Sequence, residues 1–246
     1  MTPLRVFRAL GAIDRLSVGR DPLLRWIVLL PPAVALAVRW VFPALLARGE
    51  AAFGVELDHF YPALAGYVLL VLTPNLAGMV VGFLLLDQRD DDTLTALRVT
   101  PVPLGGYLAY RLALPVALST AVTLALFPLA GLAGPGPLPL LGAALGAAPF
   151  APAFALFLAA FAANKVQGFA LTKAAGAVLA APVAAYFMEP AWRWVLAPVP
   201  TFWPAMGYWA LSRGRADGWL LLAAGFVYQL ALAALLLRRF QRVASR

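Results

Sequence analysis

The stretch PALAGYVLLVLTPNLAGMVVGFLLL, residues 62–86, contains no charged side chain. A helix needs about 20 mostly apolar residues to cross the hydrocarbon core of a bilayer, and this stretch is longer than that. It therefore predicts a membrane-spanning helix. Thr73-Pro74-Asn75 interrupts it near the middle, where Pro74 leaves a backbone carbonyl without its helical partner. Polar groups beside a kink can line a pathway, and an ordinary proline kink accounts for the pattern about as well.

Five further apolar stretches surround this one, and together they set the fold class. The chain of 246 residues is 63% hydrophobic and 12% charged, with a mean hydropathy of +0.85, whereas a soluble domain keeps about 25% of its residues charged. The sequence therefore predicts an all-α membrane protein, a single transmembrane domain over residues 1–246. Residues 26–237 hold six predicted membrane-spanning helices, at 26–46, 62–86, 112–132, 138–163, 168–188 and 219–237.

The formal net charge of +8 suggests a nucleic-acid-binding protein, but the positions of the charges do not support that class. The charges lie between the apolar stretches, which is the pattern of membrane topology, so the expected partner is the lipid bilayer and not nucleic acid. Of the 19 Lys and Arg residues, 14 fall on the side of the two termini and four on the opposite side, while Arg39 lies within the first span. Because basic residues accumulate on the cytoplasmic side, we expect both termini, with the tail 238–246, to lie in the cytoplasm beneath a bacterial-type plasma (inner) membrane.

Residues 1–25 precede the first span and are rich in arginine. On a helical wheel one side carries the apolar residues and the opposite side carries Arg8 and Arg15; the apolar residues are Val6, Ala9, Leu10, Ile13 and Leu16. This pattern favours an amphipathic helix that lies flat on the inner leaflet. A basic tail that only sets the orientation of the first span is the alternative.

The residues that carry chemistry in membrane enzymes and ion-coupled carriers are scarce in this chain. It has no cysteine, a single histidine (His59), no HExxH and no GxxxxGK[ST] phosphate-binding loop. No Asp or Glu falls inside a predicted span, although ion-coupled carriers usually bury such groups. We therefore expect no enzymatic activity, metal or cofactor in this chain, and energy for any transport would come from another subunit.

The segment between the last two spans, residues 189–217, is rich in tryptophan and proline. Five of the seven tryptophans lie in or next to it, at Trp192, Trp194, Trp203, Trp209 and Trp219. Indole rings favour the headgroup boundary, and Pro198, Pro200 and Pro204 break the segment into short pieces. We expect short re-entrant helices on the side opposite the termini.

A short charged stretch, DQRDDDTLTALRVTPVP at residues 87–103, separates the second and third spans. Asp90, Asp91 and Asp92 stand where acids favour the start of a helix, and Pro101 ends it. Leu94 and Leu97 fall on one side of that helix, and Ala96 and Val99 fall on the other. A two-turn helix that is apolar on both sides is stable only between two partners, so we expect one side to contact a separate protein. The alternative is a solvated loop whose acids only cap a turn.

Three segments together resemble the type-two ATP-binding-cassette (ABC-2) export permeases, closest to the bacterial drug-export subunits. LLLDQRDDDTLTALRVTPVPLGGYLAYRL at 84–112 is similar to their loop between spans two and three, with Asp92 at a position where the family usually has glycine. NKVQGFALTK at 164–173 and PTFWPA at 200–205 resemble a turn and an outer loop of drug-export members. The order and spacing of the three segments, within a six-span plan, carry the resemblance over nearly the whole chain.

The resemblance implies a permease subunit of an ATP-driven exporter that works by alternating access. Its partners would be a second permease subunit, identical or related, and a dimer of ATPase subunits that bind ATP and Mg. Contact with the ATPase falls to Asp90, Asp91, Asp92, Thr93, Leu94, Leu97, Arg98, Thr100 and Pro101, and a second cytoplasmic contact to Asn164, Lys165 and Gln167. The substrate path would include Thr73, Asn75, Met79, Phe83, Thr172 and Phe187, and the outer re-entrant segment Thr201, Phe202, Trp203 and Pro204.

Because no charged residue lies on that path, we expect a lipophilic substrate, drug-like or lipid-like, that is moved outward. A membrane scaffold or assembly factor that transports nothing is the main alternative, and an ion-coupled secondary transporter is a weaker one. A scaffold would explain the spans and a docking helix, but it gives no reason for a polar kink in a span or for a re-entrant segment.

Overall fold

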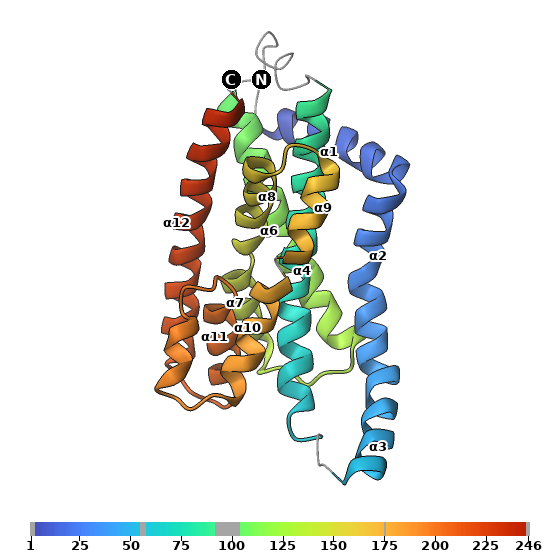
Figure 1. Cartoon of the computed structure of the whole chain (residues 1–246), viewed down its shortest axis with the longest axis vertical. Helices are drawn as coiled ribbons and strands as arrows, with labels where there is room; N and C mark the ends of the chain where they lie inside the picture. The colour runs from blue at the N-terminus through green and yellow to red at the C-terminus, as the bar shows by residue number, and fades with distance from the viewer. Residues whose placement is uncertain (1–2, 55–57, 92–103, 175, 245–246) are drawn as a thin grey trace.

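The computed structural model describes residues 3–54, 58–91, 104–174 and 176–244, and these residues form helices and short connections without a strand (Figure 1). Six helical stretches are long and apolar enough to cross a membrane. They run over Pro22–Ala52, Tyr61–Asp90, Ala109–Leu129, Pro137–Phe161, Lys165–Phe187 and Gly218–Arg242. All six predicted spans are confirmed, with ends that differ from the sequence-based boundaries by a few residues.

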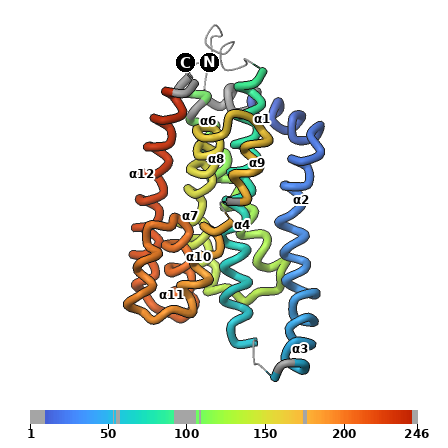
Figure 2. The backbone as a smooth tube through the Cα atoms, in the orientation of Figure 1, coloured from blue at the N-terminus to red at the C-terminus, as the bar shows by residue number. Residues whose placement is uncertain are grey.

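Two of the six spans form the centre of the bundle. In the apolar core of the second span, α4 (Tyr61–Asp90), 78% of the residues are buried, and the fourth span, made of α7 (Pro137–Ala147) and α8 (Phe150–Phe161), reaches 83%. The other four spans have only 19–33% buried. The first span, which begins with α2 (Pro22–Leu36), and the last, α12 (Gly218–Ala244), stand at opposite edges (Figures 1 and 2). The outer helices therefore present apolar side chains to lipid or to another subunit.

The fourth span is broken, although its sequence predicts one continuous helix over 138–163. A turn at residues 148 and 149 separates α7 from α8. Pro149 and Pro152 each lack the N–H that a continuous helix would use, and the ring of Pro152 would clash with the carbonyl of Ala148. Proline kinks inside an apolar run leave no trace in hydropathy, so the hydropathy of this stretch does not predict the break.

The first span changes its helical type partway. It continues from α2 through a π-helical turn, η1 (Ala37–Val41), into α3 (Phe42–Phe53). Arg39 of this turn donates from Nη1 to the Leu129 carbonyl, 3.3 Å away, at the end of α6 (Leu104–Leu129). The last carbonyls of a helix have no partner of their own, so Arg39 satisfies one of them.

The predicted re-entrant segment is confirmed. It follows α9 (Lys165–Ala174) and α10 (Gly176–Phe187), and consists of η2 (Trp192–Leu196) and α11 (Phe202–Ser212). Tyr228 donates to the carbonyl of Pro198 at 2.6 Å, and buried Gln229 donates to that of Pro200 at 3.0 Å. Residue 229 lies eleven positions beyond Gly218, where α12 begins, so the turn at 198–200 reaches about 16 Å along that span.

The N-terminal helix α1 (Pro3–Arg20) lies at the end of the bundle where both termini are found (Figure 1). The amphipathic helix is confirmed, but the predicted apolar side is wrong in part. Leu10 packs against the bundle, whereas Ile13 and Leu16 are each 55% exposed. Asp14, not an apolar residue, is buried between α1 and the spans. A charged residue can face the protein interior when a residue of opposite charge binds it there.

The two central helices approach closely because glycines remove side chains from their contact. A Cβ on Gly78 of α4 would lie 2.6 Å from the carbonyl oxygen of Ala151, and one on Gly82 would lie 2.9 Å from Cδ1 of Leu158. Small residues at such contacts let helix backbones pack in lipid, where burial from water gives no driving force between helices. The contact between α4 and α8 therefore depends on these two glycines.

Gly78→Ala should destabilise the protein by about 1–3 kcal/mol, because the added methyl group overpacks against a backbone carbonyl. The measurement is the midpoint of thermal unfolding in detergent. Gly49→Ala is the matched control, since Gly49 lies in helix α3 with nothing within 4 Å of the added atom. Equal midpoints for the two variants would contradict the close contact.

Candidate functional site

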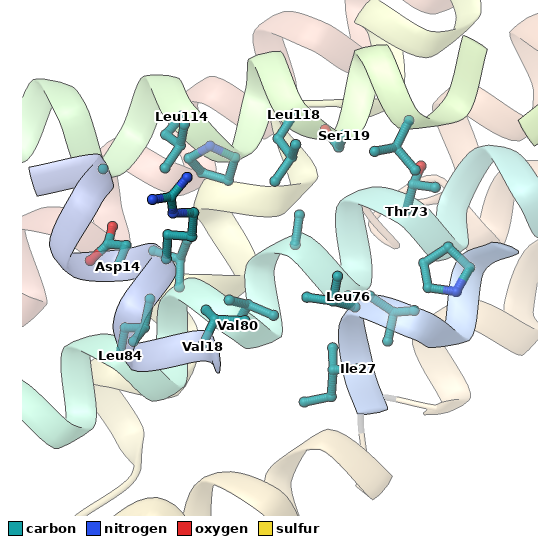
Figure 3. A pocket seen from close by; sticks show the side chains of 18 of the residues that line it. Asp14, Val18, Ile27, Thr73, Leu76, Val80, Leu84, Leu114, Leu118 and Ser119 are labelled. Carbon is teal, nitrogen blue, oxygen red and sulfur yellow. The ribbon is translucent and has the colours of Figure 1, made fainter. Parts of the chain in front are cut away.

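A cavity of about 340 Å³ lies between α1, α2, α4 and α6 (Figure 3). Its walls are apolar and come from three spans: Ile27, Val28 and Pro31 of α2, Leu76, Ala77, Val80, Val81 and Leu84 of α4, and Leu114, Pro115, Leu118 and Val122 of α6. Within α4 the lining residues recur at helical spacing on one face. From Leu84 to Thr73 the cavity follows α4 for about 16 Å, roughly half the thickness of a membrane.

The two ends of the cavity are polar. Asp14 and Arg15 of α1 line the end nearer the termini, and Thr73 and Ser119 line the other, as Figure 3 shows for the labelled side chains. The hydroxyls of Thr73 and Thr123 share a hydrogen bond that links α4 to α6. An apolar channel with hydrogen-bonding groups at its ends suits an elongated small molecule that has polar groups of its own.

The cavity opens to one side of the bundle and is closed toward the end that lies away from the termini. Val28 of α2 and Leu118 of α6 are each 51% exposed, so the opening lies between these two outer helices. Beyond Thr73, Tyr67, Leu70 and Phe127 belong to a tightly buried cluster. Access is therefore from the half of the bundle nearer the termini and from the space where lipid would lie.

A buried ion pair borders the cavity. Asp14 Oδ2 accepts from Arg111 Nη1 at 2.7 Å and from the Tyr110 hydroxyl at 2.8 Å. The side chains of Asp14 and Arg111 are 10% and 2% exposed. Arg111 also donates from Nε to the Tyr107 hydroxyl at 3.1 Å, and Tyr107 in turn donates to Gln88 of α4. The chain of contacts fastens α1 to α6 and α4.

The sequence pattern does not predict this pair. By its position Arg111 is one of the basic residues expected to orient the spans, and Asp14 belongs to no motif. The available signal was that Asp14 is the one acidic residue in the first twenty, four positions from both Leu10 and Val18 and so on one helical face with them.

A second polar cluster fastens the same end of the bundle. Lys165 Nζ binds the carboxylates of Asp21 and Asp87, the latter at 3.0 Å, and so joins the starts of α2 and α9 to the end of α4. Arg89 donates to the carbonyls of Ala162 at 2.8 Å and Ala163 at 2.6 Å, after the last turn of α8. We call the contacts of Lys165 and Arg89 the basal clamp.

Asp21 is both a helix cap and a member of the clamp. Its Oδ1 accepts from the N–H groups of Leu23 at 2.8 Å and Leu24 at 3.2 Å, at the start of α2. Partial burial acts to raise the pKa of Asp21, but the hydrogen bonds from Lys165 and the two N–H groups outweigh it and hold this pKa below its ordinary value. Asp21 is therefore ionised at neutral pH, as the contact with Lys165 requires.

The residues expected to make a second cytoplasmic contact, Asn164, Lys165 and Gln167, lie together at this clamp. Asn164 Oδ1 accepts from the N–H of Gln167 at 3.0 Å, and Gln167 Oε1 accepts from the N–H of Ala163 at 2.8 Å. The two side chains close a reciprocal cap on the start of α9. These hydrogen bonds stabilise the start of α9. The cluster also faces the end of the bundle where the termini lie.

The expected ATPase-binding residues fall mostly outside the described part of the chain: Asp92, Thr93, Leu94, Leu97, Arg98, Thr100 and Pro101. Asp90 and Asp91 are described: Asp90 is the last residue of α4, and Asp91 follows as its C-cap. Both are exposed. Acids at the C-terminal end of a helix are unfavourable with the helix dipole. The helix that Asp90 and Asp91 are expected to precede lies outside the described residues, so that prediction stays a prediction.

The expected path residues divide between two faces of α4. Thr73 lines the cavity. Met79 and Phe83 pack instead with Leu171 of α9, and Asn75 is buried away from the cavity lining. Thr172 donates to the Phe169 carbonyl at 2.7 Å within α9, and Phe187 is 60% exposed at the end of α10. The structure therefore unites Thr73 with residues of α1, α2 and α6 that the sequence did not single out.

The predicted outer residues lie at the inner turn of the re-entrant segment. Thr201 and Phe202 are fully buried, and Pro204 is buried as well. Thr201 donates to the carbonyl of Val178 in α10, and Trp203 donates from its indole nitrogen to the Ala197 carbonyl at 2.9 Å. Their contacts hold the segment against α10 and α12.

Comparison with known proteins finds relatives over nearly the whole chain. Residues 14–237 match a family described as "Fluoroquinolones export permease protein Rv2686c-like". Two curated proteins, the fluoroquinolones export permease proteins Rv2686c and MT2760 of Mycobacterium tuberculosis strains H37Rv and CDC 1551, are each 33% identical over 239 residues. The alignment covers 96% of this chain and 94% of each relative. No solved structure matches the chain.

Removing one charge of the buried pair should destabilise the protein more than removing both charges together. Arg111→Gln leaves the Asp14 carboxylate buried without a counter-ion, which costs about 3–5 kcal/mol, whereas Asp14→Asn combined with Arg111→Gln removes both charges and should be milder. The measurement is a double-mutant cycle on the thermal unfolding midpoint in detergent. Arg215→Gln, which breaks the exposed pair with Asp217, should leave the midpoint nearly unchanged. Additive effects of the two buried substitutions would show that the pair is not coupled.

Proposed function

The chain belongs to the Rv2686c-like family of fluoroquinolone export permeases, and we propose that it is the membrane-spanning subunit of an ATP-driven exporter of lipophilic drug-like molecules, fluoroquinolones among them. It would work by alternating access with a second permease subunit and a separate pair of ATPase subunits. The cavity between α1, α2, α4 and α6 is the observation that carries the proposal.

The size and lining of the cavity suit such a substrate. Sites for small molecules usually enclose about 300–1,000 Å³, with mostly apolar walls and a few polar groups, and a cavity of about 340 Å³ falls at the lower end. A fluoroquinolone is a flat ring system that carries a carboxylate and, in many members, a basic amine. Arg15 at one end of the cavity offers a positive charge for the carboxylate, whereas the neighbouring Asp14 is already paired with Arg111.

The closure of the cavity on one side supports alternating access. A molecule that enters between α2 and α6 meets the Thr73–Thr123 hydrogen bond and, beyond it, the buried cluster around Tyr67 and Phe127. This arrangement supports the proposal of a carrier with access from the side of the termini. Under the orientation expected from the basic residues, that side is the cytoplasm and the inner leaflet.

An external source of energy fits the polar groups at the same end. The chain contains no phosphate-binding loop of the GxxxxGK[ST] type. The last turn of α4 ends in exposed Asp90 and Asp91 directly before residues 92–103, and the basal clamp ties this turn to α8, α9 and α2. A push on the segment by an ATPase would reach both central helices, and α4 carries one wall of the cavity.

The fifth span is a candidate surface for the second permease subunit. Only 19% of its apolar core is buried within the chain. Val166 and Phe169 of α9 and Phe187 of α10 are 80%, 41% and 60% exposed. A subunit packed here would lie against the side of α9 that faces away from Met79 and Phe83.

Filling the cavity should abolish export without unfolding the protein. Val80→Trp places an indole in the cavity, so cells that express the chain with its ATPase should become as sensitive to norfloxacin as cells without it. Val80→Ala enlarges the cavity and should retain export. Val227→Trp, on the 66% exposed face of α12, is the matched control for an added indole.

The assays for this prediction are the norfloxacin inhibitory concentration and the accumulated drug per cell, with protein yield and unfolding midpoint as checks on folding. Full export by a well-folded Val80→Trp protein would refute the cavity as the path. Export that survives ATP depletion but stops when the proton gradient collapses would refute the ATPase.

The expected ATPase contact is tested by Leu97→Asp. If Leu97 is buried against the ATPase, its loss together with an unpaired carboxylate removes on the order of 3 kcal/mol, a more than hundredfold weaker contact. The permease should still reach the membrane in normal yield but no longer retain the ATPase in a pull-down. Val99→Asp, on the side expected to face the permease, should instead lower the yield. Unchanged ATPase retention by Leu97→Asp would contradict the assignment.

A further inference from the structure

A second cavity, of about 670 Å³, lies at the end of the bundle away from the termini. It is formed where the end of α10, η2, the end of α11 and the first turns of α12 meet. This cavity is separate from the one between α1, α2, α4 and α6, and none of its lining residues is shared with that cavity. Nothing in the proposed export path requires it.

Three arginines line this cavity, against one acid. They are Arg193, Arg213 and Arg215, and the acid is Asp217. Basic residues are few on this side of the chain, and these three are joined there only by Arg48. Basic residues that only set the orientation of the spans are expected on the opposite side. The convergence of these three arginines on one cavity therefore needs another explanation.

Two of the three arginines have no counter-ion within the described part of the chain. Arg215 is bound by Asp217, with Nε donating to Oδ1 at 3.1 Å and Nη2 to Oδ2. Arg193 reaches only the Met188 carbonyl, at 3.4 Å from Nη2, and its buried Nε has no hydrogen-bond partner among the described residues. Arg213 lies over the ring of Tyr186, 5.6 Å from its centroid, and forms no ion pair with a described residue.

The rest of the cavity wall is aromatic and apolar. Trp209 has already used its indole N–H on the Ala63 carbonyl, at 2.9 Å, and Tyr186 packs edge-on against it with ring centroids 4.7 Å apart. Trp194 is half exposed, and Leu220 of α12 is 75% exposed. The wall therefore offers ring surfaces and aliphatic contacts.

We propose that this cavity binds an amphipathic anion, with its carboxylate or phosphate at Arg193 and Arg213 and its apolar body against Trp194, Trp209 and Leu220. Guanidinium groups bind carboxylate and phosphate with charge-assisted hydrogen bonds, which are stronger than neutral ones. Two sources have this chemistry: an anionic phospholipid of the adjoining leaflet and an exported drug that bears a carboxylate. The site stands whether or not the chain exports drugs.

The experiment is calorimetric titration of the purified full-length protein in a non-ionic detergent. The probes are matched pairs that differ in the anion: dioctanoyl phosphatidylglycerol against dioctanoyl phosphatidylcholine, and norfloxacin against its methyl ester. All titrations are repeated in the Val80→Trp protein, in which the first cavity is filled. In both proteins we expect at least one anionic probe to bind tenfold or more tightly than its matched partner.

The variant Arg193→Gln with Arg213→Gln should lose that preference, whereas Arg48→Gln, on the same side but outside the cavity, should keep it. Preference for the phospholipid alone identifies a lipid site, and preference for norfloxacin alone identifies a site for departing substrate. Equal affinity for both members of each pair in the wild-type protein overturns the proposal, even if the double variant does not fold. An unchanged preference in a folded double variant overturns it as well.

Discussion

The rest of the structure depends on the contact between α4 and α8, made through Gly78 and Gly82. In lipid no burial from water draws helices together, so association depends on packing at short range and on hydrogen bonds. Two glycines on α4 let backbone meet backbone, because a Cβ at Gly78 would lie 2.6 Å from a carbonyl oxygen of α8. With one face of α4 committed to this contact, another face is left to the first and third spans. The cavity forms there, where α2 and α6 meet α4 only in part and α1 covers the end.

Charged groups in this molecule gather at the two ends of the bundle, and they do different things at each. Near the termini, Arg111, Lys165 and Arg89 each have partners within the chain. Arg111 binds Asp14, although its Nη2 has no hydrogen-bond partner among the described residues, Lys165 binds two carboxylates, and Arg89 binds the free carbonyls after α8. These contacts fix the ends of α1, α2, α4, α6, α8 and α9 relative to one another. At the opposite end, Arg193 and Arg213 stay without counter-ions among the described residues. We therefore interpret the basic residues near the termini as stabilising the fold and the two arginines at the opposite end as a binding surface.

Hydropathy alone was enough to predict the six spans, because each is a long apolar run bounded by charges. The re-entrant segment was also predictable, since Pro198 and Pro200 stand among tryptophans between two spans. The ion pair of Asp14 and Arg111 was not, because its members lie 97 residues apart and each alone reads as a surface charge. The cavity was not predictable for a related reason: most of its lining residues are Leu, Val, Ala and Pro, the same types that face lipid elsewhere. Only the packing of three spans distinguishes the two environments.

The re-entrant turn at 198–200 has a consequence for the order in which the chain can be assembled. Its carbonyls, at Pro198 and Pro200, are bonded by Tyr228 and Gln229 of α12, which the ribosome makes some thirty residues later. An unbonded carbonyl in the hydrocarbon region costs several kcal/mol, so the turn has no stable place at that depth until α12 stands beside it. The segment therefore stays in the headgroup region, which suits its tryptophans, until α12 is inserted. Only then does the turn move to its final depth in the bilayer. Completion of the half of the bundle away from the termini thus depends on the insertion of α12.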